Sequence, residues 1–435
     1  MLRCSMFSLL LFAACSSSPE RGTTEEPVNQ DTATAPDATS PADTASAETG
    51  PTEDDAPAPP PPAKRVDIVD LGDFAHADGV GMTAAMSVDL PEDAVSFQIT
   101  AMGTPGVYYA VDALKAPNGK AIVLPGWYDS ALNGDQAEIC IVCLERVASS
   151  ETVHSVLVPN SPDVPMMPGT WTFSLYAFTR EMKGGFFGQP TYKPAGGQVH
   201  VEVAIKRSDA GPPTAGVLDL NLHFTGAGGM SADSAAADPN VQKILDAFAG
   251  IYAAIGISLG TVTYRDVDPG LQVVDGFNGK GNDFEAVAAT AAGAPPGVNV
   301  FFVRELTDSA SPMAAFGVIL GISGGVPGPA ALEANGRSAV LISTADVPGQ
   351  PKGDATHMGV TMAHEVGHYL GLFHSSEFGF GQNQVHDPLP DTGENDTGNL
   401  MYYESSGNGK TLSNDQGAVL RANPWVHEPT KETAP

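Results

Sequence analysis

The sequence predicts an α+β protein in which an N-terminal antiparallel β-sandwich precedes a domain built on a twisted mixed sheet with helices. Between residues 66 and 207, apolar and polar residues alternate with period two, as in half-buried strands. After residue 217, strand-like runs alternate with runs of helical period. One of these helical runs begins the motif H-E-x-x-H-x-x-G-x-x-H, from His364 to His374, which indicates a metal site.

Residues 1–14 have the features of a signal peptide. Arg3 precedes an apolar run that is too short to span a membrane. Cys15 follows, and the sequence L-F-A-A-C around it resembles the cleavage site of bacterial lipoproteins. The resemblance implies that Cys15 is lipidated and becomes the mature N-terminus, and that Ser16 directs the protein to the outer membrane, facing the exterior. The alternative is ordinary secretion; both alternatives predict export.

Residues 15–65 are expected to form a disordered tether. Ser, Thr, Ala, Pro, Asp and Glu dominate this segment, and its last part is rich in proline. With so few large apolar side chains, the segment cannot bury enough surface to offset the loss of chain entropy. We expect it to hold the folded part away from a membrane that the protein contacts through its lipid alone.

The predicted β-sandwich covers residues 66–207 and is interpreted as an accessory domain, with a cleavable pro-segment as the alternative. Turn-forming pairs such as Asn118-Gly119 and Pro168-Gly169 separate its strands. The alternation is clearest in three runs, at residues 95–101, 171–175 and 199–205.

Cys140 and Cys143 lie in a strand-like run of this sandwich. Residues three apart in a regular strand point to opposite faces, but an exported protein also permits disulfides. A disulfide, metal ligation and free thiols therefore all remain open. A structural role is favoured over a redox or metal role.

Residues 208–216 are polar, contain Gly and Pro, and are expected to link the sandwich to a domain that covers residues 217–435. In that domain Asp238-Pro239 predicts a helix start, because Asp caps helices and Pro fits the first turn. The capping-box sequence from Ser413 to Gln416 predicts a short final helix. A glycine-rich stretch at residues 317–328 is either an edge segment beside a cleft or a mobile loop. Strands are expected near residues 218–224, 261–264, 298–303 and 339–343.

The H-E-x-x-H-x-x-G-x-x-H motif can bind a metal ion. His364 and His368 would lie one turn apart on one helix face, where both imidazoles reach the same ion. A continuous helix would carry His374 elsewhere, so the helix is expected to stop at Gly371, which enters left-handed conformations readily. Three neutral imidazoles with one open position suit catalytic Zn²⁺, and Glu365 can act on water there. The competing interpretation is a chance match with core histidines.

With this motif, the chain resembles the metzincin clan of zinc endopeptidases over about residues 217 to 424. The resemblance implies a structural methionine turn below the metal, for which Met401 is the candidate. It also implies that the hydroxyl of Tyr403 stabilises an oxyanion, although a core or rim tyrosine is the alternative. Residues 386–392, which read H-D-P-L-P-D-T, together with the surroundings of Met401 are most similar to the pappalysin family.

The segment after the motif is rich in acidic residues that offer hard oxygen ligands. Calcium binding by this loop is a hypothesis, because Ca²⁺ takes six to eight such oxygens. A solvated acidic loop is the alternative, since no EF-hand motif is present. The candidate ligands are Asp387, Asp391, Glu394 and Asp396.

The formal net charge of −30 over 435 residues predicts a surface that repels phosphate backbones, so nucleic-acid binding is excluded as a main function. The sequence therefore favours an exported or surface-anchored zinc metalloendopeptidase, with Glu365 as general base, that acts on a protein or peptide. The alternative is a non-catalytic surface lipoprotein whose sandwich binds a protein or a glycan.

Overall fold

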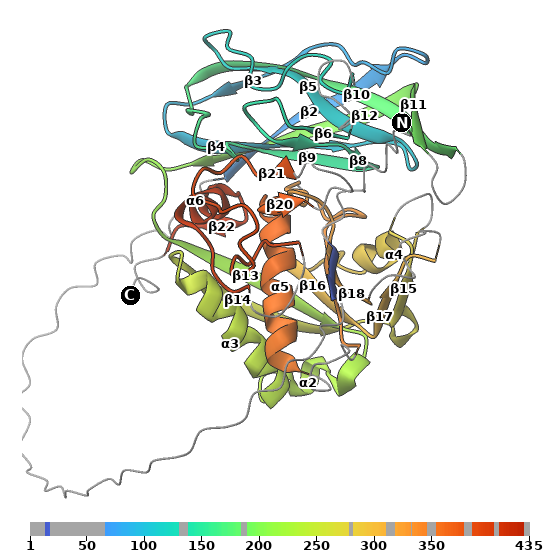
Figure 1. The fold of residues 1–435 in the computed structure, drawn as a ribbon, viewed down its shortest axis with the longest axis vertical. Coiled ribbons are helices and arrows are strands. Elements are labelled where there is room, and N and C mark those ends of the chain that lie inside the picture. The colour runs from blue at the N-terminus through green and yellow to red at the C-terminus, as the bar shows by residue number, and fades with distance from the viewer. Residues whose placement is uncertain are drawn as a thin grey trace, which may run out of the picture.

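The computed structural model has a mainly β, α+β architecture (Figure 1). The predicted signal peptide up to residue 13 and residues 18–65 of the predicted tether lie outside the described residues. No helix in the described part is long and apolar enough to cross a membrane. The structure describes residues 14–17, 66–129, 138–183, 189–277, 282–309, 318–331, 333–345, 354–377, 385–403 and 409–429.

Two antiparallel sheets form the upper part of the molecule in Figure 1, which confirms the antiparallel strands expected there. Their facing apolar side chains, among them Phe97, Trp171 and Val203, form one core. One sheet has the order β2 (Val66–His76), β12 (Gly197–Arg207), β4 (Ala94–Met102), β9 (Val153–Val158). The other has the order β11 (Gln189–Pro194), β10 (Gly169–Lys183), β5 (Tyr108–Lys115), β8 (Ser150–Glu151), and β3 (Met86–Leu90) pairs with β10.

Strand β4 departs from the half-buried pattern that its alternation predicts. Its polar residues Ser96, Gln98 and Thr100 are each fully buried, because they face the second half of the molecule rather than water. Their side chains donate to the backbone carbonyls of Ala422, Gly328 and Ala330 at 2.5, 2.7 and 3.2 Å respectively. The polar face of this strand is therefore an internal interface.

The second half is built on a mixed sheet. Its central strands are parallel, and the expected strands near residues 218–224, 261–264, 298–303 and 339–343 all occur in it. Strand β18 (Val318–Ser323) runs antiparallel to its neighbour, so part of the glycine-rich stretch is a strand. The order is β14 (Ile257–Asp266), β13 (Gly216–Phe224), β16 (Val298–Val303), β19 (Val340–Ser343), β18, β17 (Glu305–Thr307), β15 (Val273–Asp275), and β22 (Val426–His427) pairs with β13.

Two long helices pack together on this sheet, α3 (Pro239–Ala253) and α5 (Ala355–Tyr369). Helix α3 begins as expected, because the Asp238 carboxylate accepts from the backbone N–H of Asn240 at 2.7 Å. The hydroxyl of Tyr252 in α3 donates to the carbonyl of Ala363 in α5 at 3.1 Å. The shorter helices are α2 (Ala232–Ala235), α4 (Asp283–Ala289) and α6 (Asn414–Ala422), the last with the expected capping box.

A short strand lies at the start of the predicted tether. Residues Ala14–Ser17 form β1, which pairs antiparallel with β18 and places Cys15 opposite Gly321. An extended segment can satisfy the backbone donors and acceptors of β18 that β19 and β17 leave unpaired, which is the physical reason for this pairing. Lipidation of Cys15 stays a prediction.

Candidate metal centre

Helix α5 carries the first two histidines of the motif. Its N-terminus is capped by Asp354, whose carboxylate accepts from Thr356 N–H at 3.0 Å. His364 is 2% exposed, and Glu365 and His368 are fully buried. Helical spacing thus places two imidazoles and one carboxylate inside the protein on a single rigid element.

The helix ends where the sequence predicts. Its last residue is Tyr369, and Gly371 has a φ of +116°, a conformation that L side chains rarely adopt. The chain then turns back so that the Nε2 atoms of His364 and His374 lie 3.3 Å apart, and those of His364 and His368 lie 2.9 Å apart. The structure therefore brings the three predicted ligands together, with ligand atoms within 4.8 Å of one another.

Hydrogen bonds to backbone carbonyls set the tautomers of the two helical histidines. His364 Nδ1–H donates to the carbonyl of Leu400, and His368 Nδ1–H donates to that of Leu372, each at 2.6 Å. A carbonyl only accepts, so each neutral ring presents a lone pair at Nε2.

The donor set fits a tetrahedral metal ion. The facing lone pairs of His364 and His368 cannot bond to each other, and a cation between them removes their repulsion. Zn–N bonds of about 2.0–2.1 Å at tetrahedral angles place neighbouring nitrogens about 3.3 Å apart. The spacing of 3.3 Å between His364 and His374 matches this value, and the 2.9 Å spacing of the other pair is slightly shorter.

Burial keeps these rings neutral. Desolvation, with a smaller effect of His374, lowers the pKa of His364 to about 3. Burial also lowers the pKa of His368 well below its usual value. Neutral imidazole is the form that binds metal, so both rings are ready to act as ligands at neutral pH.

Strand β18 passes directly beside Glu365. An ideal Cβ at Gly321 would lie 2.5 Å from Glu365 Cγ and 3.0 Å from its Oε1, so only glycine fits there. The glycine-rich stretch thus borders the candidate centre as a strand. The sequence singled out the stretch but not Gly321, whose role depends on a contact between distant segments.

Met401 lies under α5 and is fully buried. Its backbone N–H donates to Asn399 Oδ1 at 2.8 Å. The side-chain amides of Asn399 and Gln416 exchange two hydrogen bonds of 3.0 and 3.1 Å. Sequence reasoning used Gln416 only as a helix cap; in the structure it also supports the turn that carries Met401.

Tyr403 follows this turn and is half-buried. Its ring lies 4.7 Å from that of Tyr402, centroid to centroid. Its role toward an oxyanion stays a prediction.

The four candidate calcium ligands have separate partners. Asp387 accepts from Leu389 N–H at 3.1 Å, and burial raises its pKa to about 6. Asp391 accepts from Ser413 Oγ at 2.6 Å, Asp396 from Gly398 N–H at 2.9 Å, and Glu394 lies 3.4 Å from His386. Within the described residues, the three histidines are the only group of three or more His, Cys, Asp or Glu side chains that could hold a metal ion. The structure does not gather the four carboxylates into one site.

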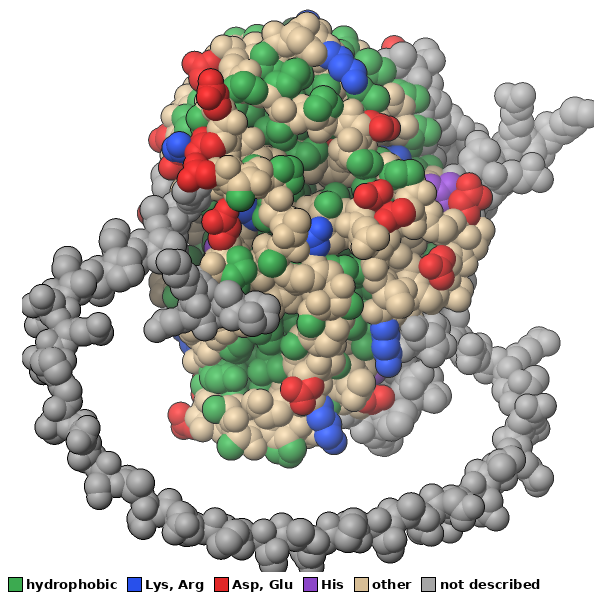
Figure 2. All heavy atoms as spheres, turned by 90° about the vertical axis from the view of Figure 1, so that its left-hand side faces the viewer, with side chains coloured by type: hydrophobic (Ala, Val, Ile, Leu, Met, Phe, Trp, Pro, Cys, Tyr) green, Lys and Arg blue, Asp and Glu red, His purple; other side chains and the backbone are tan. Residues whose placement is uncertain are grey.

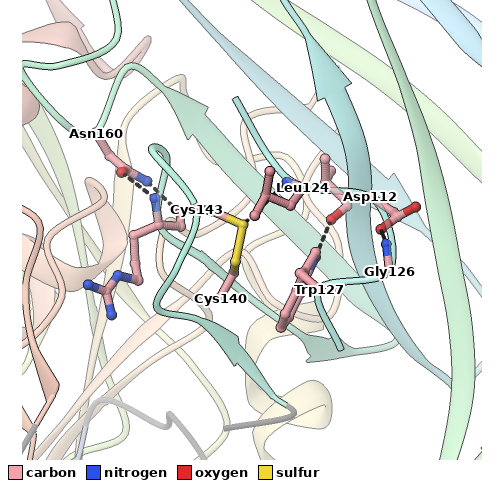
Figure 3. Close-up of a disulfide and its surroundings, with 9 residues drawn as sticks. Asp112, Leu124, Gly126, Trp127, Cys140, Cys143 and Asn160 are labelled. Carbon is pink, nitrogen blue, oxygen red and sulfur yellow. Dashed lines mark hydrogen bonds between the residues drawn. A yellow bond between two sulfur atoms is a disulfide. The ribbon is translucent and has the colours of Figure 1, made fainter. Parts of the chain in front are cut away.

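Cys140 and Cys143 form a disulfide with an S–S distance of 1.99 Å, which settles the alternatives that the sequence left open. Strand β6 (Ile139–Cys140) ends at the first cysteine, so the two residues are not in one regular strand. Figure 3 shows the bond beside Leu124, whose backbone N–H donates to Cys143 Sγ at 3.4 Å. The disulfide is remote in sequence from the histidines.

No family model and no curated protein matches the chain. Among solved structures, it is similar to metalloproteinase-II from Bacteroides fragilis, with 15% sequence identity and a TM-score of 0.28. That match covers 51% of this chain and 62% of the other, so the chain spans less than two thirds of the length of that protein. A likeness at this level identifies no family. The fold and the site by themselves define a mainly β protein with a buried three-histidine cluster that could hold a metal ion.

Proposed function

We propose that this chain is a zinc-dependent endopeptidase of the metzincin type, most similar to the pappalysins. The observation that carries the proposal is the convergence of three Nε2 atoms from His364, His368 and His374, within 4.8 Å of one another. Glu365 follows the first of these ligands directly in α5. This arrangement supports metal-assisted hydrolysis of a peptide bond.

Each residue of the centre has a defined task in this proposal. A bound Zn²⁺ would polarise the scissile carbonyl and lower the pKa of water. The Glu365 carboxylate takes the proton of the attacking water and passes it to the leaving amine. The Tyr403 hydroxyl donates to the oxyanion of the tetrahedral intermediate. Met401 is a buried apolar side chain that packs under the helix.

The proposal includes export and a lipid anchor at Cys15 in the outer membrane, with secretion as the alternative. Arg3, the apolar run after it and the L-F-A-A-C sequence support this location. Acidic side chains are spread over both halves of the face in Figure 2, with fewer Lys and Arg between them. Together with the net charge of −30, this surface supports a protein or peptide substrate rather than a nucleic acid.

The test compares the purified protein with Glu365→Gln and His368→Ala on a mixed peptide library, with bound zinc quantified in all three. We expect the parent to bind zinc and cut peptides, and Glu365→Gln to bind zinc but cut at least about 100-fold more slowly. His368→Ala should lose zinc. Zinc binding without cleavage by the parent would favour a non-catalytic lipoprotein whose sandwich binds a protein or glycan. A parent without zinc would refute the proposal.

A further inference from the structure

We propose that the β-sandwich is a permanent part of the metal centre: it holds the turn at residues 370–373 that delivers His374. This inference rests on the proposed function, because it takes His374 as a metal ligand. The helix positions His364 and His368 through its own hydrogen bonds, but His374 lies beyond the helix end. Tertiary contacts therefore position the third ligand; the sandwich supplies two of them directly and supports a third.

The first contact joins Leu157 of β9 to Gly371. An ideal Cβ at Gly371 would lie 3.1 Å from Leu157 Cδ2, so the leucine packs directly on the turn. Its neighbours Val156 and Val158 point into the core of the sandwich, whereas Leu157 belongs to the core of the second half. Alternate residues of one strand thus serve two cores.

The second contact reaches the residue before His374. Phe373 is 5% exposed and forms a small apolar cluster with Val326 and with Ile139 and Ala148 of the sandwich. Ile139 and Ala148 face each other across the β6–β7 pair, where β7 covers Val147–Ala148. The strand pair next to the disulfide therefore packs against the ligand-bearing segment.

The third contact is polar and buried. The side-chain amide of Asn423 donates to the carbonyl of Leu370, the residue at the end of α5, at 3.1 Å. The same amide contacts Gln98 Oε1 of β4 at 3.4 Å, and Gln98 Nε2 donates to Gly328 O at 2.7 Å. Asn423 thus satisfies the carbonyl that the helix end leaves unpaired, and a side chain of the sandwich contacts the Asn423 amide.

These contacts argue against the sandwich as a removable pro-segment. Its loss would remove Leu157 from Gly371, expose Phe373 to water and leave the partners of Gln98 unpaired. In Figure 1, the upper end of α5 points toward the sandwich, in agreement with these contacts. Residues that orient a metal ligand commonly change metal affinity by about 10–100-fold when they are mutated.

The test is a double-mutant cycle on the full chain, with zinc affinity measured by competition with a chromogenic chelator. We expect Leu157→Ala to weaken zinc binding about tenfold or more. In a His374→Ala background, where the third ligand is absent, Leu157→Ala should have no further effect. The matched control is Leu175→Ala, a fully buried leucine in the sandwich core, which should lower the melting temperature but leave zinc affinity unchanged.

Leu157→Val provides a milder change in case the alanine variant fails to fold; it should weaken zinc binding less, and again only when His374 is present. The absorption spectrum of the Co²⁺-substituted protein should also change in Leu157→Ala and not in Leu175→Ala. Equal zinc affinity of parent and Leu157 variants, or an equal loss in both backgrounds, would overturn the inference while leaving the proposed function intact. A parent that does not bind zinc would overturn both.

Discussion

The sulfur of Met401 lies against α5 at the position of Gly367. An ideal Cβ at Gly367 would be 2.9 Å from Met401 Sδ, closer than real Cβ atoms approach another heavy atom. Gly367 directly precedes His368 in the helix. The absence of a side chain at this position therefore sets the distance between α5 and the turn that carries Met401.

Gly367→Ala is expected to destabilise the protein by about 1–3 kcal/mol, because overpacking forces either the helix or Met401 to move. Zinc affinity should fall as well. The matched control is Gly250→Ala in α3, where no atom lies within 4 Å of an added Cβ. That variant should be more stable by up to about 1 kcal/mol, since alanine favours helix. Denaturant unfolding with and without zinc measures the stability of both variants and the stabilisation that zinc adds. A Gly367→Ala variant with the stability of the parent would contradict the prediction.

Gln416→Glu should loosen the turn that carries Met401. Gln416 is fully buried, and its Nε2 donates to Asn399 Oδ1 at 3.1 Å. Glutamate keeps the shape but replaces this donor with an acceptor, at a cost of roughly 1–3 kcal/mol. Asn414→Asp makes the same chemical change at an exposed site in the first turn of α6 and should stay within about 0.5 kcal/mol of the parent. Equal stabilities of the two variants in chemical unfolding would disprove the role of Gln416.

Lys206 should give the protein a distinctive pH dependence. Its Nζ is buried, and the carbonyl oxygens of Arg421, Asn423 and Val426 lie within hydrogen-bond distance of it. Burial lowers its pKa from 10.5 to about 7. Between these two pH values the unfolded chain holds a proton that the folded chain lacks, so this residue adds stability as the pH rises.

The expected gain from pH 7 to 10 is at most about 4 kcal/mol relative to Lys206→Met, whose free energy of unfolding should follow a flatter curve. Lys193 is the control, because it is exposed and paired with Glu181 at 2.8 Å. Lys193→Met should keep the slope of the parent. A Lys206→Met variant with the same slope as the parent would show that the buried amine stays charged throughout.

The disulfide should contribute modestly to stability. Closing so short a loop restricts the unfolded chain by roughly 2 kcal/mol. Removing Cys140 and Cys143 together, each replaced by Ser, should therefore lower the melting temperature by several degrees. A thiol reductant should shift the parent in the same direction and leave the double variant unchanged. A parent that melts identically with and without reductant would refute this contribution.

Much of the second half could be predicted because its signals are local. Asp238, Ser413 and Gly371 mark helix boundaries through the conformations of single residues, and the structure places boundaries at each. The use of the acidic residues after the motif was less predictable. A run of carboxylates resembles a ligand set, but three of the four accept hydrogen bonds in turns or at a helix start and the fourth lies beside His386, and only the folded chain shows these separate partners.

The sequence by itself determined which residues can form the metal site, since helical spacing and the glycine stop depend on neighbours along the chain. It also determined that β4 is a strand. Only the tertiary structure decided that the polar face of β4 meets the second half, that Gly321 passes beside Glu365, and that Leu157 packs on Gly371. The reason is physical: alternation shows which side chains share a face, whereas the partner of that face depends on how distant segments pack.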